Sequence, residues 1–408
     1  MPQKSYKIIN DPVHGFIRIS HPLVFSIIEH PYFQRLRRIK QLGLTEYVYP
    51  GALHTRFHHA LGAYHLMGIA LDTLRSKGID ISDEEALACQ IAILLHDVGH
   101  GPFSHALEYT ILEGVHHEQL SLLIMQKLNE QFNNALHLAI RIFCNEYERP
   151  FFHQLVSSQL DMDRLDYLQR DCYFTGVQEG TIGAARLLKM IDVVNDELVI
   201  EEKGIYSIEN FLTARRVMYW QVYLHKTTIA TEQMIVQIMR RAKELAQAGV
   251  SLPATPALSF FLLNRIRQNN FHESEETLKA FTSLDDYDIW AAIKQWTDHP
   301  DYVLSELSRR LLERRLFKVR LSPAPLPAAW IEERKQEILA KLPAAGYLPY
   351  FLIQGSTENT AYQTKGSSIQ VLRKDGKLID IAEASDLPNI KALKKMVKKY
   401  YVCWAKYN

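Results

Sequence analysis

The sequence has few cysteines, almost no net charge and no long apolar run, and each absence excludes a class of protein. Its 408 residues include four scattered cysteines without a C-x-x-C pair, which argues against a disulfide framework and a zinc ribbon. Lys and Arg number 47 and Asp and Glu 46, a net charge of +1, so no overall field favours nucleic acid or a membrane surface. No apolar segment is long enough to cross a bilayer, and residues 1–6 do not open a signal peptide. The sequence therefore predicts a soluble protein of the reducing cytosol, with a cytoplasmic location.

Hydrophobic periodicity predicts a mainly α protein. Apolar stretches at residues 6–9 and 16–19 predict a short β-hairpin. Over residues 22–320 the apolar residues recur mostly at helical spacing. A second small hairpin, predicted from 198–200 and 205–206, interrupts them. With 408 residues, of which 47% are hydrophobic, the chain is long enough and apolar enough to bury one large core.

The pattern changes after residue 320. Three prolines within residues 322–327 predict a linker, since none of them fits inside a helix. Beyond it we expect an amphipathic helix at 330–342 and a closing helix at 390–404. Short strands are predicted at 349–354, 369–373 and 378–381, with a hairpin turn at 375–376. We therefore predict a helical domain at 1–320 and a small α+β subdomain at 321–408.

Histidine is concentrated in one part of the chain. Nine of the 17 histidines lie between His54 and His117. His96 and Asp97 stand where an apolar helix meets a Gly-Pro break. Burying polar side chains there costs free energy unless they hydrogen-bond or bind a metal ion. Together with an earlier imidazole and a later carboxylate they form a set suited to a first-row divalent ion. The predicted ligands are His59, His96, Asp97 and Asp163.

Helix capping is the competing interpretation of these residues. Asp161 or Asp163 has the residue type and position of an N-cap before a helix. Each of the four candidates taken alone fits a capping role, whereas the set in this order favours a metal centre.

The order His59, His96-Asp97, Asp163 resembles the HD phosphohydrolase superfamily, and longer segments resemble its deoxynucleoside triphosphate triphosphohydrolase branch. The resemblance covers roughly the first 230 residues in the family's order. The matching segments are Asn10 to Gly15, Phe33 to Arg37, Lys40 to Gly43, Arg56 to Gly62, His96 to His105, Asp161 to Asp171 and Tyr223 to Lys226.

This resemblance implies a multi-helix HD-domain core and hydrolysis of dNTPs to deoxynucleoside and tripolyphosphate by a metal-activated water. It implies one divalent ion, for which the sequence does not distinguish Mn, Fe, Mg, Zn and Ni, with Mg²⁺ accompanying the substrate phosphates. Asp97 is then both a ligand and a catalytic residue. His117 is the implied acid for the leaving oxygen and Glu118 its positioning partner. Because the family generally forms dimers or tetramers, a homo-oligomer is also implied.

The resemblance further implies a substrate pocket. A triphosphate carries about four negative charges and requires nearby cations. Residues implied to contact phosphates are Arg56, His100, His105, Arg164, Arg215 and Lys226. Residues implied at the sugar are Gln41, Leu42, Tyr167, Asp171 and Tyr223, where the tyrosine ring of Tyr223 would exclude a 2′-hydroxyl.

The chain departs from the family's pattern at several positions. Where animal members of this branch have two consecutive arginines, this chain has Trp220-Gln221. His58 stands in the place of the glutamate in the branch's Arg-Phe-Glu-His motif. Glu29 stands where the family's allosteric site has an aspartate, although Arg37 matches. The resemblance therefore does not imply that nucleotides activate this protein through an allosteric site like the family's.

Two other functions stay open. One is an HD phosphohydrolase for another nucleotide, a monophosphate or a signalling nucleotide. The other is a nucleotide-binding or nucleic-acid-binding protein with a vestigial HD site, supported by lysines in the predicted C-terminal helix. A solvated helix face explains the same lysines and is favoured over nucleic acid. They are Lys391, Lys394, Lys395, Lys398, Lys399 and Lys406.

Overall fold

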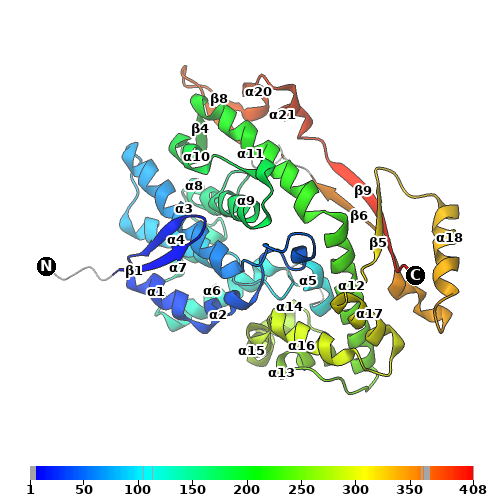
Figure 1. Ribbon diagram of the computed structural model, residues 1–408. Helices are drawn as coiled ribbons and strands as arrows, with labels where there is room; N and C mark the ends of the chain where they lie inside the picture. Colours follow the sequence, from blue (N-terminus) through cyan, green and yellow to red (C-terminus); the bar gives the residue numbers. More distant parts are fainter. Residues whose placement is uncertain (1–5, 104, 113, 360–361, 363–367, 408) are drawn as a thin grey trace.

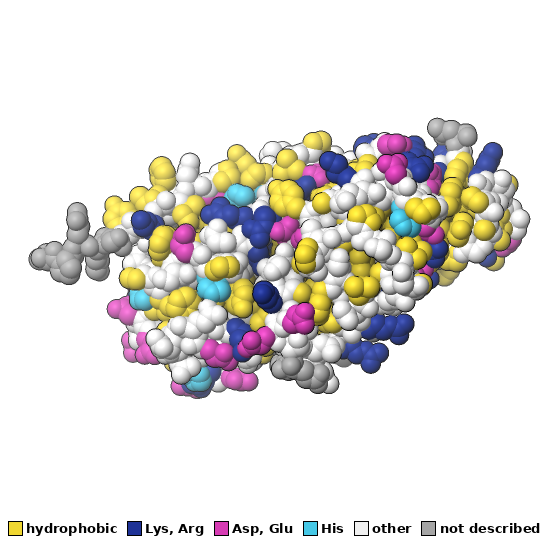
Figure 2. All heavy atoms as spheres, turned by 90° about the horizontal axis from the view of Figure 1, so that it is seen from below, with side chains coloured by type: hydrophobic (Ala, Val, Ile, Leu, Met, Phe, Trp, Pro, Cys, Tyr) yellow, Lys and Arg dark blue, Asp and Glu magenta, His cyan; other side chains and the backbone are white. Residues whose placement is uncertain are grey.

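The computed structural model describes residues 6–103, 105–112, 114–359, 362 and 368–407. Helices dominate it, and three small sheets lie among and beside them (Figure 1). On the face in Figure 2, Lys and Arg side chains alternate with Asp, Glu and apolar side chains, in keeping with the balanced charge of the chain. Among the described residues, no helix combines the length and apolarity that a membrane span requires.

The predicted N-terminal hairpin is confirmed as β1 (Lys7–Asp11) paired antiparallel with β2 (Gly15–Ile19). Its turn is fixed by Asp11, whose Oδ1 accepts the N–H groups of Val13 at 3.0 Å and His14 at 2.9 Å. Gly15 adopts a φ of 74°, which glycine reaches without strain. The hairpin is followed by α1 (Pro22–Glu29), α2 (Pro31–Gln34) and the short 3₁₀ turns η1 (Arg35–Arg38) and η2 (Thr45–Tyr47).

Three helices form the centre of the molecule. The helix α3 (Arg56–Ser76) packs against both α4 (Asp83–Leu95) and α9 (Met162–Thr175). A capping box between Ser82 and Glu85 starts α4, whose last turns are fully apolar and buried. Asp161 caps the start of α9, and Gly176 ends it in the left-handed conformation. These ends place polar side chains next to α3.

The remaining helices surround this centre and extend it toward the C-terminal end (Figure 1). Nearest to it are α5 (His105–Ile111), α6 (His117–Gln131), α7 (His137–Phe143), α8 (Pro150–Val156), η3 (Gln178–Gly180), α10 (Ala184–Met190), α11 (Ile205–Met218), the π-helical turn η5 (Tyr219–Tyr223) and α12 (Lys226–Gln247). After α12 follow α13 (Pro256–Leu263), α14 (Gln268–Glu273), α15 (Glu275–Ser283), α16 (Asp286–Trp296) and α17 (Tyr302–Leu312).

The predicted second hairpin exists, but with a different partner strand. β3 (Ile191–Val194) pairs antiparallel with β4 (Glu197–Glu201) through Asn195 and Asp196, both at positive φ. Such a two-residue turn suits a hairpin. After it, η4 (Glu202–Gly204) leads directly into α11, so the strand predicted at 205–206 was wrong.

The C-terminal part is α+β, as predicted. It contains β5 (Lys318–Ser322), α18 (Ala328–Leu339), η6 (Ala345–Tyr347), α19 (Leu348–Phe351), β6 (Leu352–Asn359), β7 (Gln370–Leu372), β8 (Leu378–Asp380), α20 (Ile381–Ala384), α21 (Pro388–Ala392) and β9 (Val397–Trp404). One sheet has the order β5-β9-β6 and another the order β3-β4-β7-β8. The helix predicted at 390–404 was wrong, because β9 is the central strand of the first sheet.

The two parts of the chain share these sheets. β7 pairs in parallel with β4 at Val199 to Gln370, so residues after 320 complete a sheet begun before residue 202. The boundary between 1–320 and 321–408 stays a prediction.

Candidate metal centre and substrate pocket

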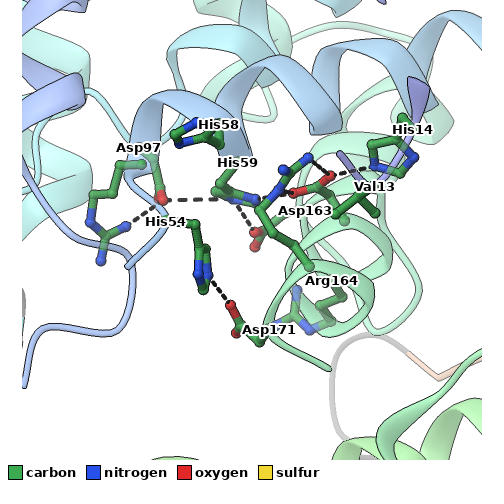
Figure 3. Close-up of polar contacts among 12 residues, drawn as sticks. Val13, His14, His54, His58, His59, Asp97, Asp163, Arg164 and Asp171 are labelled. Atoms are coloured by element: carbon green, nitrogen blue, oxygen red, sulfur yellow. Dashed lines mark hydrogen bonds and ion pairs between the residues drawn. The ribbon is translucent and has the colours of Figure 1, made fainter. Parts of the chain in front are cut away.

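The structure brings the four predicted ligands together. His59 comes from α3, His96 and Asp97 from the end of α4, and Asp163 from the first turn of α9. His59 Nε2 lies 3.1 Å from Asp163 Oδ1 and 3.7 Å from Asp97 Oδ2. His96 Nε2 lies 3.4 Å from one oxygen of each carboxylate. Figure 3 shows His59 between the two carboxylates.

The spacing and chemistry of these atoms fit a metal ion. Ligand atoms about 2.1 Å from a divalent ion lie roughly 3.0–3.4 Å from one another, close to the distances found. His59 Nε2 and His96 Nε2 are buried and make no hydrogen bond with any residue that the structure describes. Each ring instead uses Nδ1 toward the protein, His96 toward the carbonyl of Ile93 at 2.6 Å and His59 toward Asp166 at 2.8 Å. Two buried nitrogens without partners thus face two carboxylates.

The carboxylates around His59 and His96 strongly favour a positive charge between them. Burial disfavours the charged form of His59, but Asp163 and Asp166 outweigh it and raise its pKa to about 10. Burial likewise opposes ionisation of Asp163, yet His59 and His96 hold its pKa below the usual range. A bound cation would supply this charge without protonating the imidazoles.

The turn that carries Asp97 is fixed from both sides. Arg35, fully buried, donates to the carbonyls of Val98 at 2.9 Å and His100 at 2.8 Å. On the other side, Ser121 of α6 accepts the N–H of Gly99 at 2.9 Å and donates to the carbonyl of His96 at 2.7 Å. These hydrogen bonds therefore fix the position of the turn relative to the start of α6.

The position of α6 brings His117, its first residue, next to the candidate metal centre. Its ring stacks on His100 with centroids 3.8 Å apart, and His100 Nε2 lies 3.4 Å from Asp97 Oδ1. The predicted partner Glu118 lies 3.6 Å from His117 Nε2 but is 65% exposed. Glu108 of α5 lies 3.4 Å from Nδ1, is 10% exposed, and also accepts the backbone N–H of His117. Sequence reasoning missed Glu108, because nothing in the sequence separates it from other helical acids.

Two of the predicted phosphate-contacting arginines present unpartnered buried nitrogens. Arg164 pairs with Asp161 through its terminal nitrogen, and Arg215 donates to Gln159 at 3.1 Å. The Nε atoms of both arginines are buried without a hydrogen bond to the described residues. Burial raises the pKa of Tyr167, and the charges of Arg164 and Arg215 both act against that rise, so each guanidinium lies near this tyrosine.

The other predicted cations differ in placement. Arg56 is buried and pairs with Asp97, so its charge acts on a candidate ligand. Lys226 is exposed at the start of α12. His105 begins α5, but its side chain is outside the described residues. The departure at His58 has a structural explanation, since its Nδ1 accepts the N–H of Thr55 and caps α3.

The residues implied at the sugar form a second cluster beside the metal centre. Asp171 accepts from the hydroxyl of Tyr223 at 2.7 Å, and its other oxygen lies 2.7 Å from His54 Nε2 (Figure 3). Tyr167 stands edge to face with both His59 and Tyr223, at 6.3 Å between centroids. Gln41, preceding the half-buried Leu42, bonds through its backbone to His54 and keeps a buried, unpartnered Oε1. The cluster thus joins three separate segments of the chain.

Sequence reasoning also missed a buried network behind His59. Its members are Asp166 and Arg170 of α9 and Asp11 and His14 of the β1–β2 hairpin. The four-residue spacing of Asp166 and Arg170 places both on one helical face with the candidate ligand, and that spacing was the available signal.

Comparison with known proteins agrees with this geometry. The HD domain matches residues 56–171, and the HD associated region matches residues 182–251. An uncharacterized protein of Bacillus subtilis is 31% identical over 398 residues, covering 93% of this chain and 88% of that protein. Human deoxynucleoside triphosphate triphosphohydrolase SAMHD1 is 30% identical over 379 residues, covering 82% of this chain but 58% of the human protein. A crystal structure of a phosphohydrolase from Bacteroides thetaiotaomicron superposes with a TM-score of 0.95 at 55% identity, covering 98% of this chain and all of that one.

Proposed function

Because the chain belongs to the HD-domain phosphohydrolase family, we propose that it hydrolyses deoxynucleoside triphosphates to deoxynucleoside and tripolyphosphate. One observation carries the proposal: His59, His96 and Asp163 lie within reach of one ion, and the two imidazoles present buried nitrogens without a described partner. Asp97 lies beside them, 3.7 Å from His59 Nε2 and 3.4 Å from His96 Nε2. The similarity to human and Dictyostelium proteins named as deoxynucleoside triphosphate triphosphohydrolases supports the choice of substrate.

The candidate ligands suit a hydrolytic metal centre. His59, His96, Asp97 and Asp163 would hold one divalent ion, which supplies an activated water and draws charge from the phosphate when bound. Asp97 is kept ionised for this role. Burial opposes its ionisation, but His96, Arg56 and His100 hold its pKa well below the usual range.

Proton transfer to the leaving oxygen falls to His117. A 5′-oxygen leaves a phosphate more easily when it takes up a proton, and an imidazole can donate one near neutral pH. Glu108 faces Nδ1 of this histidine, so a proton held at Nδ1 is stabilised while Nε2 exchanges with the substrate. The exposed Glu118, near Nε2, is the alternative positioning residue.

Substrate binding uses the two clusters described above. The unpartnered Nε atoms of Arg164 and Arg215 are donors for phosphate oxygens. Asp171 and the Oε1 atom of Gln41 are acceptors for the 3′-hydroxyl. The ring of Tyr223, held against Asp171 by its hydroxyl, occupies the space that a 2′-hydroxyl would need.

A product assay tests the proposal. The purified protein is incubated with each dNTP, each NTP and a nucleoside monophosphate, with Mn²⁺, Mg²⁺ or chelator, and the products are identified by chromatography. We expect tripolyphosphate from dNTPs, lost with chelator and in His59→Ala, and retained in the control Asp301→Asn. Asp301 pairs with Arg241 far along the chain and touches none of the candidate ligands.

Other outcomes point to the alternatives. Inorganic phosphate from the monophosphate would replace the proposal with a phosphohydrolase for another nucleotide. No turnover with any metal, together with tight binding of single-stranded DNA, would indicate a vestigial site. We also expect a homo-oligomer, a dimer or tetramer, which light scattering at defined protein concentration would detect.

A further inference from the structure

Asp166 is the most heavily bonded carboxylate beside the candidate metal centre. Its side chain is fully buried; Oδ2 lies 2.8 Å from His59 Nδ1, and Oδ1 lies 2.6 Å from His14 Nε2. Arg170, one turn later on α9, donates to both oxygens at 2.9 Å. Space for this arrangement comes from Gly62 of α3, where a Cβ would lie 1.9 Å from Asp166 Oδ1. The sequence of α3 is thus adapted to this carboxylate.

The bond to Asp166 determines which nitrogen of His59 is available. Arg170 donates to both oxygens of Asp166 and forms a buried ion pair with it. A carboxylate paired in this way only accepts hydrogen bonds, so neutral, metal-binding His59 must carry its proton on Nδ1. The lone pair on Nε2 then points toward Asp97 and Asp163, the position that a metal ligand requires.

Asp166 is in turn held by the N-terminal hairpin. Arg170 also donates to Asp11, at the end of β1, at 2.8 and 3.3 Å. His14, in the turn of the same hairpin, supplies the bond to the second oxygen of Asp166. Residues about 150 positions apart in the sequence therefore fix one carboxylate behind one candidate ligand.

We propose that Asp166 is the positioning residue of His59, and that His14 supports it, so that metal affinity depends on residues that do not contact the ion. This proposal rests on the metal site of the proposed function, but not on the identity of the nucleotide. Replacing Asp166 by asparagine keeps the shape and introduces an amide N–H₂ that can donate to Nδ1. His59 would then carry its proton on Nε2 and lose the lone pair that binds metal.

The test measures Mn²⁺ binding without nucleotide. Metal-free wild type, Asp166→Asn and His14→Ala are titrated with Mn²⁺, and free Mn²⁺ is counted by electron paramagnetic resonance. We expect the dissociation constant to rise about 10- to 100-fold in Asp166→Asn, the range for lost outer-shell partners of metal ligands, and by a smaller factor in His14→Ala. Imidazole ¹⁵N spectra with diamagnetic Zn²⁺ bound should show the single proton of His59 on Nδ1 in wild type, and a weaker signal of this kind in Asp166→Asn at the same Zn²⁺ concentration.

Asp301→Asn is the matched control, because it also removes a largely buried carboxylate paired with arginine. It should lower thermal stability and leave Mn²⁺ affinity unchanged. Wild-type affinity in a folded Asp166→Asn protein would overturn the proposal. If that variant does not fold, His14→Ala decides, and unchanged affinity there overturns it. Failure to hydrolyse dNTPs would refute the proposed function alone, since this measurement contains no nucleotide.

Discussion

Substitution of Gly99 by alanine should separate catalysis from metal binding. A Cβ at Gly99 would lie 2.2 Å from the carbonyl oxygen of His117 and 2.3 Å from the amide nitrogen of Ser121, both backbone atoms of α6. Ordinary contact begins near 3.4 Å, so one side must retreat by about 1 Å. The turn is held by two hydrogen bonds from buried Arg35, and we therefore expect α6 to move and to carry His117 with it.

The structure gives the size of both effects. A displacement of about 1 Å of a catalytic group costs roughly 100-fold in rate, or about 2.7 kcal/mol in activation free energy. Overpacking of a buried contact costs about 1–3 kcal/mol of unfolding free energy. The candidate ligands lie outside α6, so Mn²⁺ affinity should stay within about twofold of wild type.

Single-turnover hydrolysis of a dNTP at saturating Mn²⁺ measures the rate, and titration with Mn²⁺ measures the affinity. Gly346→Ala is the control, because a Cβ at that position meets no atom within 4 Å. A wild-type rate in Gly99→Ala would refute the reasoning, as would a large loss of Mn²⁺ affinity at an unchanged rate.

Two further predictions concern the neighbouring loops. Asp286 accepts the N–H groups of Lys40 and Phe103, and burial raises its pKa from 3.8 to about 6. Since the folded state binds this proton more tightly, unfolding free energy relative to Asp286→Asn should fall as pH rises from about 3 to about 7, by about 3 kcal/mol. Urea titrations of both proteins across that range measure it, and parallel curves would contradict the argument. Tyr223→Phe keeps the ring and should keep the preference for dNTPs over NTPs, whereas Tyr223→Ala should reduce it by about tenfold or more. If both variants have the same ratio of kcat/KM for dNTPs to kcat/KM for NTPs, the ring of Tyr223 does not exclude a 2′-hydroxyl.

The sequence allowed the candidate ligands to be named but not the residues that support them. His59, His96, Asp97 and Asp163 could be named because their order along the chain is a motif, and in the structure Asp97 lies 3.4–3.7 Å from the two imidazoles that face Asp163. The capping interpretation is confirmed for Asp161, which caps α9, whereas Asp163 faces His59 and stays a candidate ligand. The contacts of Asp166 with the N-terminal hairpin join segments 152 residues apart, which no local pattern reports. Glu108 contacts His117 only nine residues later, but nothing in the sequence distinguishes it from other helical acids.

The C-terminal error has a different physical origin. The lysine-rich stretch has helical spacing, yet Val397, Tyr400 and Val402 are residue types that favour strands. Pairing with β5 and β6 determines the outcome, and both partners lie far away in sequence. Lys398 and Lys399 consequently project from opposite faces of a strand, so the lysines form no helical stripe for nucleic acid.

The central place of β9 makes the order of synthesis matter. β5 and β6 both pair with β9 in their sheet, and the ribosome makes β9 after both of them. The candidate metal ligands are all synthesised by residue 163, so the helices that carry them can begin folding while the sheet is still open. β9 also brings Lys399 to 3.7 Å from the centre of the Trp220 ring, which belongs to η5. The completed sheet thus places a cation beside the segment in which Trp220-Gln221 departs from the family's pattern.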